Sequence, residues 1–228
     1  MEQLKTIIEN AWEDISLRST QETKTAIETI IEQVDKGELR TAQPNEDGTW
    51  TVNDWVKKAI IMYFPIRKME VQEVGIFEFH DKMKLKSGYA ALGVRAVPHA
   101  VARYGAYLAK NVVLMPSYVN IGAFVDEGTK IGRAATVGSC AQIGKDVHLS
   151  GGVGIGGVLE PAQAAPVIIE DGAFIGSRCI VVEGARIGKR AVLGAGVTIT
   201  GSSKIIDVTG PEPVEYIGFV PENSVVIP

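Results

Sequence analysis

A six-residue period governs the C-terminal half of the chain. Steps of six from Val101 reach an aliphatic residue every time up to Ile155, with the single exception of Tyr107. The same ladder resumes at Ile169 and continues to Ile205. Small residues often stand two positions before each aliphatic residue, and glycine often follows it. This pattern is typical of a stacked β-solenoid, in which each repeat buries its aliphatic residue only against neighbouring repeats.

The ladder predicts a triangular prism in which three six-residue sides complete one coil and the aliphatic side chains fill the axis. Its members are Val101, Tyr107, Val113, Val119, Val125, Ile131, Val137, Ile143, Leu149 and Ile155, then Ile169, Ile175, Val181, Ile187, Leu193, Ile199 and Ile205. At the usual strand spacing of about 4.8 Å, this column is about 25 Å tall. Residues 156–166 interrupt the ladder and are expected to project as an external loop.

The first part of the chain follows helical spacing. Apolar residues recur every three or four positions from Leu4 to Ile15 and again from Ile27 to Val34. Each run predicts one amphipathic helix. Gly37 is expected to end the second helix, because glycine readily adopts the left-handed conformation that follows many helices.

A hairpin and a third helix are predicted next. Turn-forming residues at 44–48 separate two short extended runs, which indicates a hairpin. Asn53 is expected to cap a helix that Pro65 stops. We therefore predict an α-rich N-terminal domain with a hairpin over residues 1–95, and a parallel β-helix over residues 96–228.

Composition excludes several classes of function. The net charge is −4, so the chain lacks the basic balance that usually accompanies nucleic-acid binding. The two cysteines, Cys140 and Cys179, make no disulfide framework, and no cysteine or histidine cluster has the spacing of zinc ligands. There is no secretory signal pattern and no run of about eighteen apolar residues. A cytoplasmic protein with no metal and no membrane partner is expected.

Three stretches resemble the tetrahydrodipicolinate N-succinyltransferase family of hexapeptide-repeat acyltransferases. They are Met115-Pro116-Ser117-Tyr118-Val119-Asn120-Ile121-Gly122-Ala123, Val137-Gly138-Ser139-Cys140-Ala141-Gln142-Ile143-Gly144-Lys145 and Val147-His148-Leu149-Ser150-Gly151-Gly152-Val153-Gly154-Ile155-Gly156-Gly157-Val158-Leu159-Glu160-Pro161. The resemblance continues through residues 169–171, 182–184 and 210–216. It implies a left-handed coil, which the six-residue period does not define, and a homotrimer with active sites in the grooves between subunits.

The resemblance also implies a reaction. Members of the family transfer a succinyl group from succinyl-coenzyme A to the amine of 2-amino-6-oxopimelate, the acyclic form of tetrahydrodipicolinate, on the route to diaminopimelate and lysine. A thioester is already activated, so we expect catalysis by alignment, removal of one proton and stabilisation of the oxyanion by backbone N–H groups. No acyl-enzyme and no metal are expected.

Candidate site residues follow from the same resemblance. The external loop covers the thioester arm in the family, which makes Gly152, Gly156, Gly157 and Glu160 candidates for binding coenzyme A. Arg95 stands where the family has an arginine that binds a substrate carboxylate, and Ser139 and Arg178 are further candidates for substrate binding. The catalytic group is unknown, with His148 and Glu183 as weak candidates. Cys140 is expected to be structural, because no histidine and acid accompany it.

Three departures from the family bear on activity. Many relatives carry an aspartate that contacts the substrate amine where this chain has Gly132, and a glutamate where it has Ile180. Relatives also continue past the position of Pro228 with residues that cap the prism and help to bind coenzyme A.

Alternative functions stay open on the sequence alone. One is a catalytically impaired or redesigned trimeric scaffold, and another is a hexapeptide acetyltransferase that acts on a different amine. Replacing Gly132 with aspartate is expected to restore activity if only the amine contact is missing.

Overall fold

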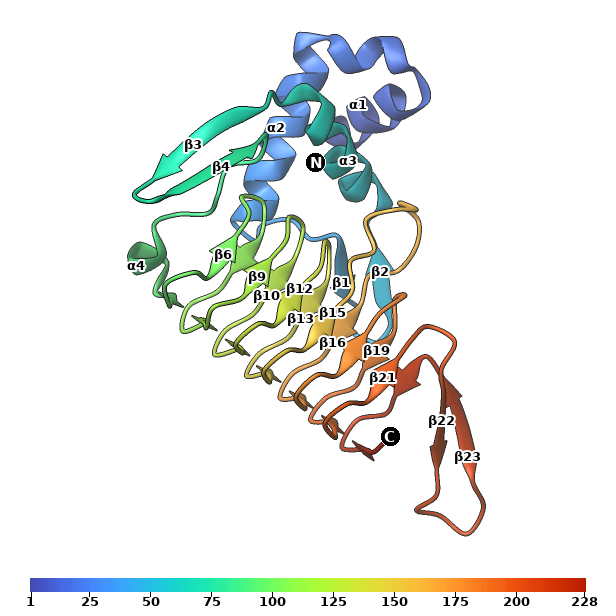
Figure 1. Ribbon diagram of the computed structural model, residues 1–228. Helices are drawn as coiled ribbons and strands as arrows, with labels where there is room; N and C mark the ends of the chain where they lie inside the picture. Colours follow the sequence, from blue (N-terminus) through green and yellow to red (C-terminus); the bar gives the residue numbers. More distant parts are fainter.

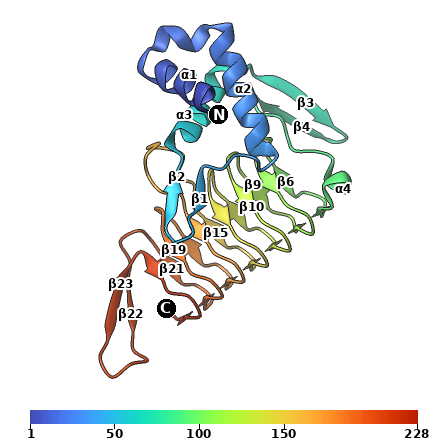
Figure 2. The same cartoon turned by 180° about the vertical axis from the view of Figure 1, so that it is seen from behind.

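The molecule is a three-sided prism of short parallel strands with helices packed at one end (Figure 1). The computed structural model describes residues 1–228, the whole chain. The hairpin of β1 and β2 reaches down from the helices along the prism, as the view from behind shows (Figure 2). The N-terminal elements are α1 (Glu2–Glu13), the 3-10 helix η1 (Ile15–Ser19), α2 (Gln21–Asp35), β1 (Ala42–Pro44), β2 (Trp50–Val52), α3 (Asp54–Ile66), β3 (Glu70–Val74), β4 (Phe77–Asp81) and α4 (Tyr89–Leu92).

The three long helices confirm the predicted amphipathic stripes except at Ile15, which begins η1 after the end of α1 and is 72% exposed. They bury Ile8 of α1, Ile27 of α2 and Ile60 of α3 in one hydrophobic cluster. The same cluster includes Ile121 and Cys140 of the prism, so helices and prism share their packing. This shared core holds the helical part against one edge of the prism.

The ends of the helices agree with the sequence in part. Gly37 follows α2 with a φ of +75°, as predicted. Helix α3 continues through Pro65 to Ile66, because a proline in the last turn removes only one helical hydrogen bond. Asn53 occupies the N-cap position of α3, but its side-chain amide donates to the Arg40 carbonyl at 2.8 Å instead of capping the helix.

Two antiparallel hairpins accompany the helices. The pairing of β1 with β2 confirms the predicted hairpin. The pairing of β3 with β4 was not predicted, although apolar and polar residues alternate from Phe77 to His80 after its turn at Gly75. Its tip residue Ile76 is 94% exposed, so this hairpin lacks the buried face that gives strands a clear sequence signal.

Three parallel sheets form the sides of the prism. The β5 sheet contains β5 (Arg95–Ala96), β8 (Val113–Leu114), β11 (Lys130–Ile131), β14 (His148–Leu149), β17 (Phe174–Ile175), β20 (Val192–Leu193) and β25 (Val225–Val226). The β6 sheet contains β6 (Val101–Ala102), β9 (Tyr118–Val119), β12 (Thr136–Val137), β15 (Gly154–Ile155), β18 (Ile180–Val181) and β21 (Thr198–Ile199). The β7 sheet contains β7 (Tyr107–Leu108), β10 (Phe124–Val125), β13 (Gln142–Ile143), β16 (Ile168–Ile169), β19 (Arg186–Ile187) and β24 (Phe219–Val220).

The predicted ladder is confirmed from Val119 onward and is wrong by one position before it. The residues that point into the first coils are Ala102, Leu108 and Leu114, whereas the predicted Val101, Tyr107 and Val113 lie on the outer surface and are only partly buried. Strand pairing fixes this register, since Leu114 pairs with Ile131. The shift arises because five positions, not six, separate Leu114 from Val119.

The insertions of the prism gather along the edge between the β6 and β7 sheets. The external loop leaves this edge after β15 and returns at β16. A second insertion, the hairpin of β22 (Lys204–Asp207) and β23 (Val214–Ile217), leaves it between β21 and β24 and was not predicted. Ile205, the last member of the predicted ladder, is buried at the base of this hairpin, and Val220 then continues the column by pairing with Ile187.

Candidate active site

A pocket on the edge between the β6 and β7 sheets unites four of the predicted site residues, and we call it the loop pocket. Its lining includes Gly156, Gly157 and Glu160 of the external loop and Glu183 of the coil beyond. The other lining residues are Val158, Pro161, Ala164, Ala165, Val182 and Gly184. The structure therefore brings together a glycine-rich loop and a carboxylate that lie more than twenty positions apart in the sequence.

Lys57 of helix α3 anchors the external loop. Its ammonium group donates hydrogen bonds to the carbonyl oxygens of Pro161, at 3.3 Å, and Ala164, at 2.7 Å. The lysine is fully buried, and this burial lowers its pKa. Leu159 packs against the helical cluster beside it. Lys57 was not predicted, because nothing near it in the chain indicates a partner more than one hundred positions away.

Backbone contact between the loop and the coil of Ser139 is unusually close. A Cβ atom on Gly138 would lie 2.2 Å from the Gly157 nitrogen, so this contact requires glycine. The N–H of Val158 donates to the Ser139 carbonyl at 3.2 Å. The N–H groups of Ser139 and Gly157 have no acceptor within the chain. These two groups are therefore available as donors to an oxygen atom of a ligand.

A polar network leads from the Ser139 hydroxyl along the same edge. The hydroxyl accepts a hydrogen bond of 2.8 Å from the side-chain amide of Asn120. The side-chain oxygen Oδ1 of Asn120 accepts hydrogen bonds from the Tyr118 hydroxyl at 3.1 Å and from the Arg103 guanidinium at 3.4 Å. Arg103 in turn pairs with Asp81 of β4 at 2.8 Å. Sequence analysis did not select these residues, although Tyr118 and Asn120 lie within the first stretch that resembles the family.

Gly152 and Arg178 lie together on a different edge, between the β5 and β6 sheets. The Arg178 N–H donates to the carbonyl of Gly151 at 3.0 Å, and a Cβ atom on Gly152 would lie 3.3 Å from the Arg178 side chain. Both residues have positive φ angles, which turn the chain at this corner. They are not part of the loop pocket. The outer surface of the β6 sheet, where Ile180 is 38% exposed, separates them from it.

Arg95 and His148 lie on the outer surface of the β5 sheet. Strand pairing places both in one column, with Val113 and Lys130 between them. The imidazole of His148 stacks on the Phe174 ring, with 4.9 Å between centroids and 12° between planes. Burial, assisted by the charge of Lys130, lowers the pKa of His148. Within one chain, this column does not line the loop pocket.

The cysteines offer no exposed nucleophile. Cys140 is completely buried, and this burial raises the pKa of its thiol to about 12. Cys179 is also buried, with its thiol donating to the Gly194 carbonyl at 2.9 Å. A thiolate at Cys140 is therefore strongly disfavoured at neutral pH.

The chain holds no group of three or more metal-ligating side chains close enough to bind one ion. None of its helices combines the length and the apolar character needed to cross a membrane.

The stacked hexapeptide coils and the glycine-rich loop on one edge define the class of hexapeptide-repeat acyltransferases. Residues 3–66 match the N-terminal region of tetrahydrodipicolinate N-succinyltransferase, and residues 166–201 match the hexapeptide repeat of succinyl-transferases. The chain is 51% identical over 237 aligned residues to the 2,3,4,5-tetrahydropyridine-2,6-dicarboxylate N-succinyltransferase of Paraburkholderia phymatum, with 99% of this chain and 85% of the relative covered. The enzyme of the same name from Burkholderia multivorans gives the same values.

The chain belongs to the tetrahydrodipicolinate N-succinyltransferase family. A solved structure of an N-succinyltransferase from Campylobacter jejuni superposes with a TM-score of 0.57 at 17% identity, over 85% of this chain and 56% of the other. This likeness bears on the fold alone, and together with the hexapeptide match it confirms the left-handed parallel β-helix with a small helical N-terminal part.

Proposed function

We propose that this protein transfers a succinyl group from succinyl-coenzyme A to the amine of 2-amino-6-oxopimelate, a step of diaminopimelate and lysine biosynthesis. The observation that carries the proposal is the 51% identity to enzymes named for this activity, over 99% of the chain. The relatives are named as succinyltransferases, which favours a succinyl donor over an acetyl donor. We further propose that the protein acts in the cytoplasm, where its two thiols stay reduced.

The proposed reaction is a direct transfer from thioester to amine. The amine attacks the thioester carbonyl, the carbonyl oxygen gains negative charge, and collapse of the intermediate expels the coenzyme A thiolate. The free N–H groups of Ser139 and Gly157 are suited to bind that oxygen. Direct transfer is supported by the complete burial of Cys140, which removes the one cysteine near the loop as a nucleophile.

The amine must lose a proton during the transfer. Glu183 lines the loop pocket and supplies one carboxylate for this purpose. His148 is the second proposed acceptor, because a lowered pKa keeps its imidazole neutral at neutral pH. In one chain the two groups lie on different sides of the prism, so His148 would reach the reaction only from a neighbouring subunit.

We propose a homotrimer in which the β5 sheet of one subunit faces the β6 sheet of the next. The outer surface of the β7 sheet is partly covered by the hairpin of β1 and β2, which leaves the other two sheets open. Phe174 on the β5 sheet is 42% exposed and Ile180 on the β6 sheet is 38% exposed. Exposed apolar side chains of this kind could pack against another subunit. This arrangement would set Arg95 and His148 opposite a neighbour's loop pocket.

The test is release of free thiol from succinyl-coenzyme A in the presence of 2-amino-6-oxopimelate. We expect turnover with succinyl-coenzyme A at least about tenfold faster than with acetyl-coenzyme A. Glu183→Gln should lower kcat, whereas Glu127→Gln on an open corner should not. Faster turnover with acetyl-coenzyme A would indicate an acetyltransferase, and no turnover by a protein whose mass is that of a trimer would indicate a scaffold.

A further inference from the structure

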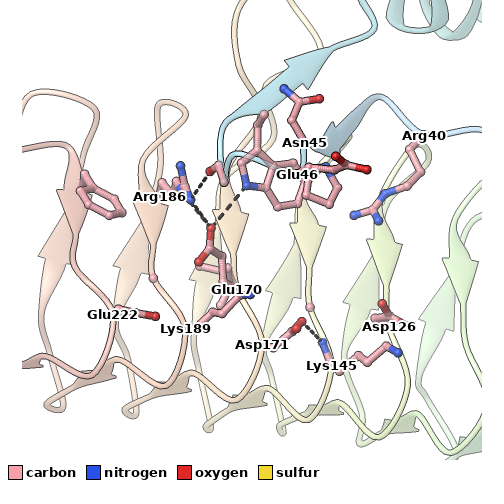
Figure 3. A pocket seen from close by; sticks show the side chains of 17 residues that line it. Arg40, Asn45, Glu46, Asp126, Lys145, Glu170, Asp171, Arg186, Lys189 and Glu222 are labelled. Atoms are coloured by element: carbon pink, nitrogen blue, oxygen red, sulfur yellow. Dashed lines mark hydrogen bonds and ion pairs between the residues drawn. The ribbon is translucent and has the colours of Figure 1, made fainter.

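A second cavity, which we call the hairpin pocket, lies between the hairpin of β1 and β2 and the outer surface of the β7 sheet (Figure 3). Its volume is about 480 Å³, and ten of its 17 lining residues are polar or charged. None of the site residues described above lines this pocket.

The walls of the hairpin pocket are held together by contacts between distant parts of the chain. The Arg186 guanidinium donates to the Gly48 carbonyl at the hairpin tip, at 2.8 Å, and pairs with Glu170. The Trp50 indole N–H donates to the same Glu170 carboxylate at 3.3 Å. The charges of Arg186 and Glu170 therefore neutralise each other, and the same two side chains hold the hairpin against the prism.

Arg40 lies in the same pocket without a carboxylate partner. Its Nε atom donates to the Gln142 side-chain oxygen at 2.9 Å, and its guanidinium lies 3.7 Å from the centroid of the Phe124 ring and 5.5 Å from that of Trp50. No ion pair of the structure includes Arg40. Burial lowers the pKa of Arg40 to about 10, and the negative charges of Asp126 and Asp171 oppose this shift without forming an ion pair with the guanidinium.

The buried side chain of Gln142 fixes the orientation of Arg40. Gln142 is fully buried, and its amide nitrogen donates to the Thr41 hydroxyl at 3.0 Å and to the Cys140 carbonyl at 2.9 Å. These bonds direct the amide oxygen of Gln142 toward the Nε of Arg40. Only the Nε donor of the guanidinium is used, so its terminal nitrogens remain free for a ligand.

Carboxylates lie across the pocket from this guanidinium. Figure 3 shows Asp126 and Asp171 on the prism side of the pocket and Arg40 above them, with open space between. Asp171 accepts a hydrogen bond of 2.8 Å from the Lys145 N–H, and neither aspartate takes part in an ion pair. One end of the pocket thus offers free cationic donors and the other offers free carboxylates.

We propose that the hairpin pocket binds a small zwitterion of the α-amino acid class, with its carboxylate on Arg40 and its ammonium group on Asp126 and Asp171. An inorganic anion would meet the repulsion of two carboxylates, and a simple cation would meet the repulsion of Arg40 and Lys145. A zwitterion satisfies both ends at once. This inference does not depend on the proposed succinyl transfer, because binding is measured without turnover.

Isothermal titration calorimetry on the full-length protein tests the assignment, with glycine, L-alanine and L-norleucine as probes. Acetate and methylammonium, which carry the two charges singly, serve as reference ligands. We expect at least one amino acid to bind at least about tenfold more tightly than either reference ligand. Asp126→Asn and Arg40→Gln should each weaken that binding about tenfold or more, whereas Glu127→Gln, next in sequence but outside the pocket, should leave it unchanged.

Three results would overturn the proposal. They are no heat from any amino acid up to about 20 mM, equal binding of acetate and amino acid, and unchanged affinity in Asp126→Asn. Circular dichroism of Arg40→Gln checks that its fold is intact. If that variant does not fold, Asp126→Asn alone decides, because the one hydrogen bond of the Asp126 side chain is local, from the N–H of the adjacent Glu127.

Discussion

The Nζ atom of Lys57 lies 2.7 Å from the carbonyl oxygen of Ala164, and this bond joins helix α3 to the external loop across 107 positions of the sequence. A second bond to Pro161 makes the same connection. The charged group is satisfied only by neutral carbonyl oxygens. The helical part of the chain therefore fixes the loop that lines the proposed acyl-transfer site.

Lys57→Met is expected to loosen the external loop. Methionine fills similar space but leaves two carbonyl oxygens without donors, which should lower the free energy of unfolding by about 1–3 kcal/mol. Urea titration measures this loss, and KM for the acyl donor should rise. Lys58→Met is the matched control, because Lys58 pairs with Asp54 of the same helix and lies 5.9 Å from the centroid of the Trp12 ring, without a hydrogen bond to the external loop. Equal losses in the two variants would contradict an anchoring role.

Leu114→Ala tests the register of the first coils. Leu114 is completely buried and Val113 is not, so we expect Leu114→Ala to cost about 2–5 kcal/mol of unfolding free energy and Val113→Ala less than about 1 kcal/mol. The two substitutions are compared by urea denaturation. A larger loss of stability in Val113→Ala than in Leu114→Ala would instead support the register predicted by steps of six from Val101.

That register shows how far the sequence determines the fold. A branched aliphatic residue at every sixth position is a local pattern, so the prism could be predicted from it. The first three sides could not be aligned, because Val113 and Leu114, like Tyr107 and Leu108, are both apolar and either member of each pair could point inward. Only pairing between coils, such as Leu114 with Ile131, distinguishes them.

Only part of the candidate site could be predicted from the sequence. The glycine-rich loop could be found because its residues are adjacent in sequence and interrupt a regular repeat. Lys57 and Arg40 could not be found, since their partners Ala164 and Gln142 lie more than one hundred positions away. Within one chain His148 and Arg95 lie apart from the loop pocket, and only the proposed homotrimer would bring them to it.

Gly132→Asp is expected to destabilise the protein and not to raise its turnover. A Cβ atom at this position would lie 2.4 Å from the Leu149 carbonyl oxygen, so the backbone of two coils must separate. We expect a loss of about 1–3 kcal/mol. Gly151→Asp is the control, because its Cβ would meet only the Arg133 carbonyl, at 3.6 Å. Increased thiol release without loss of stability would instead show that an acid at this corner was the only missing group.

The pH dependence of turnover tests His148 as a proton acceptor. Burial and the Lys130 charge lower the pKa of its imidazole from 6.5, so the neutral form persists to a lower pH than for a free histidine. The acidic limb of kcat/KM should therefore fall below pH 6.5. Lys130→Gln removes one of the two causes and should move this limb upward, in step with the His148 titration followed by NMR. If the acidic limb stays in place while the NMR titration of His148 moves, another group accepts the proton. Glu183→Gln should then abolish the acidic limb.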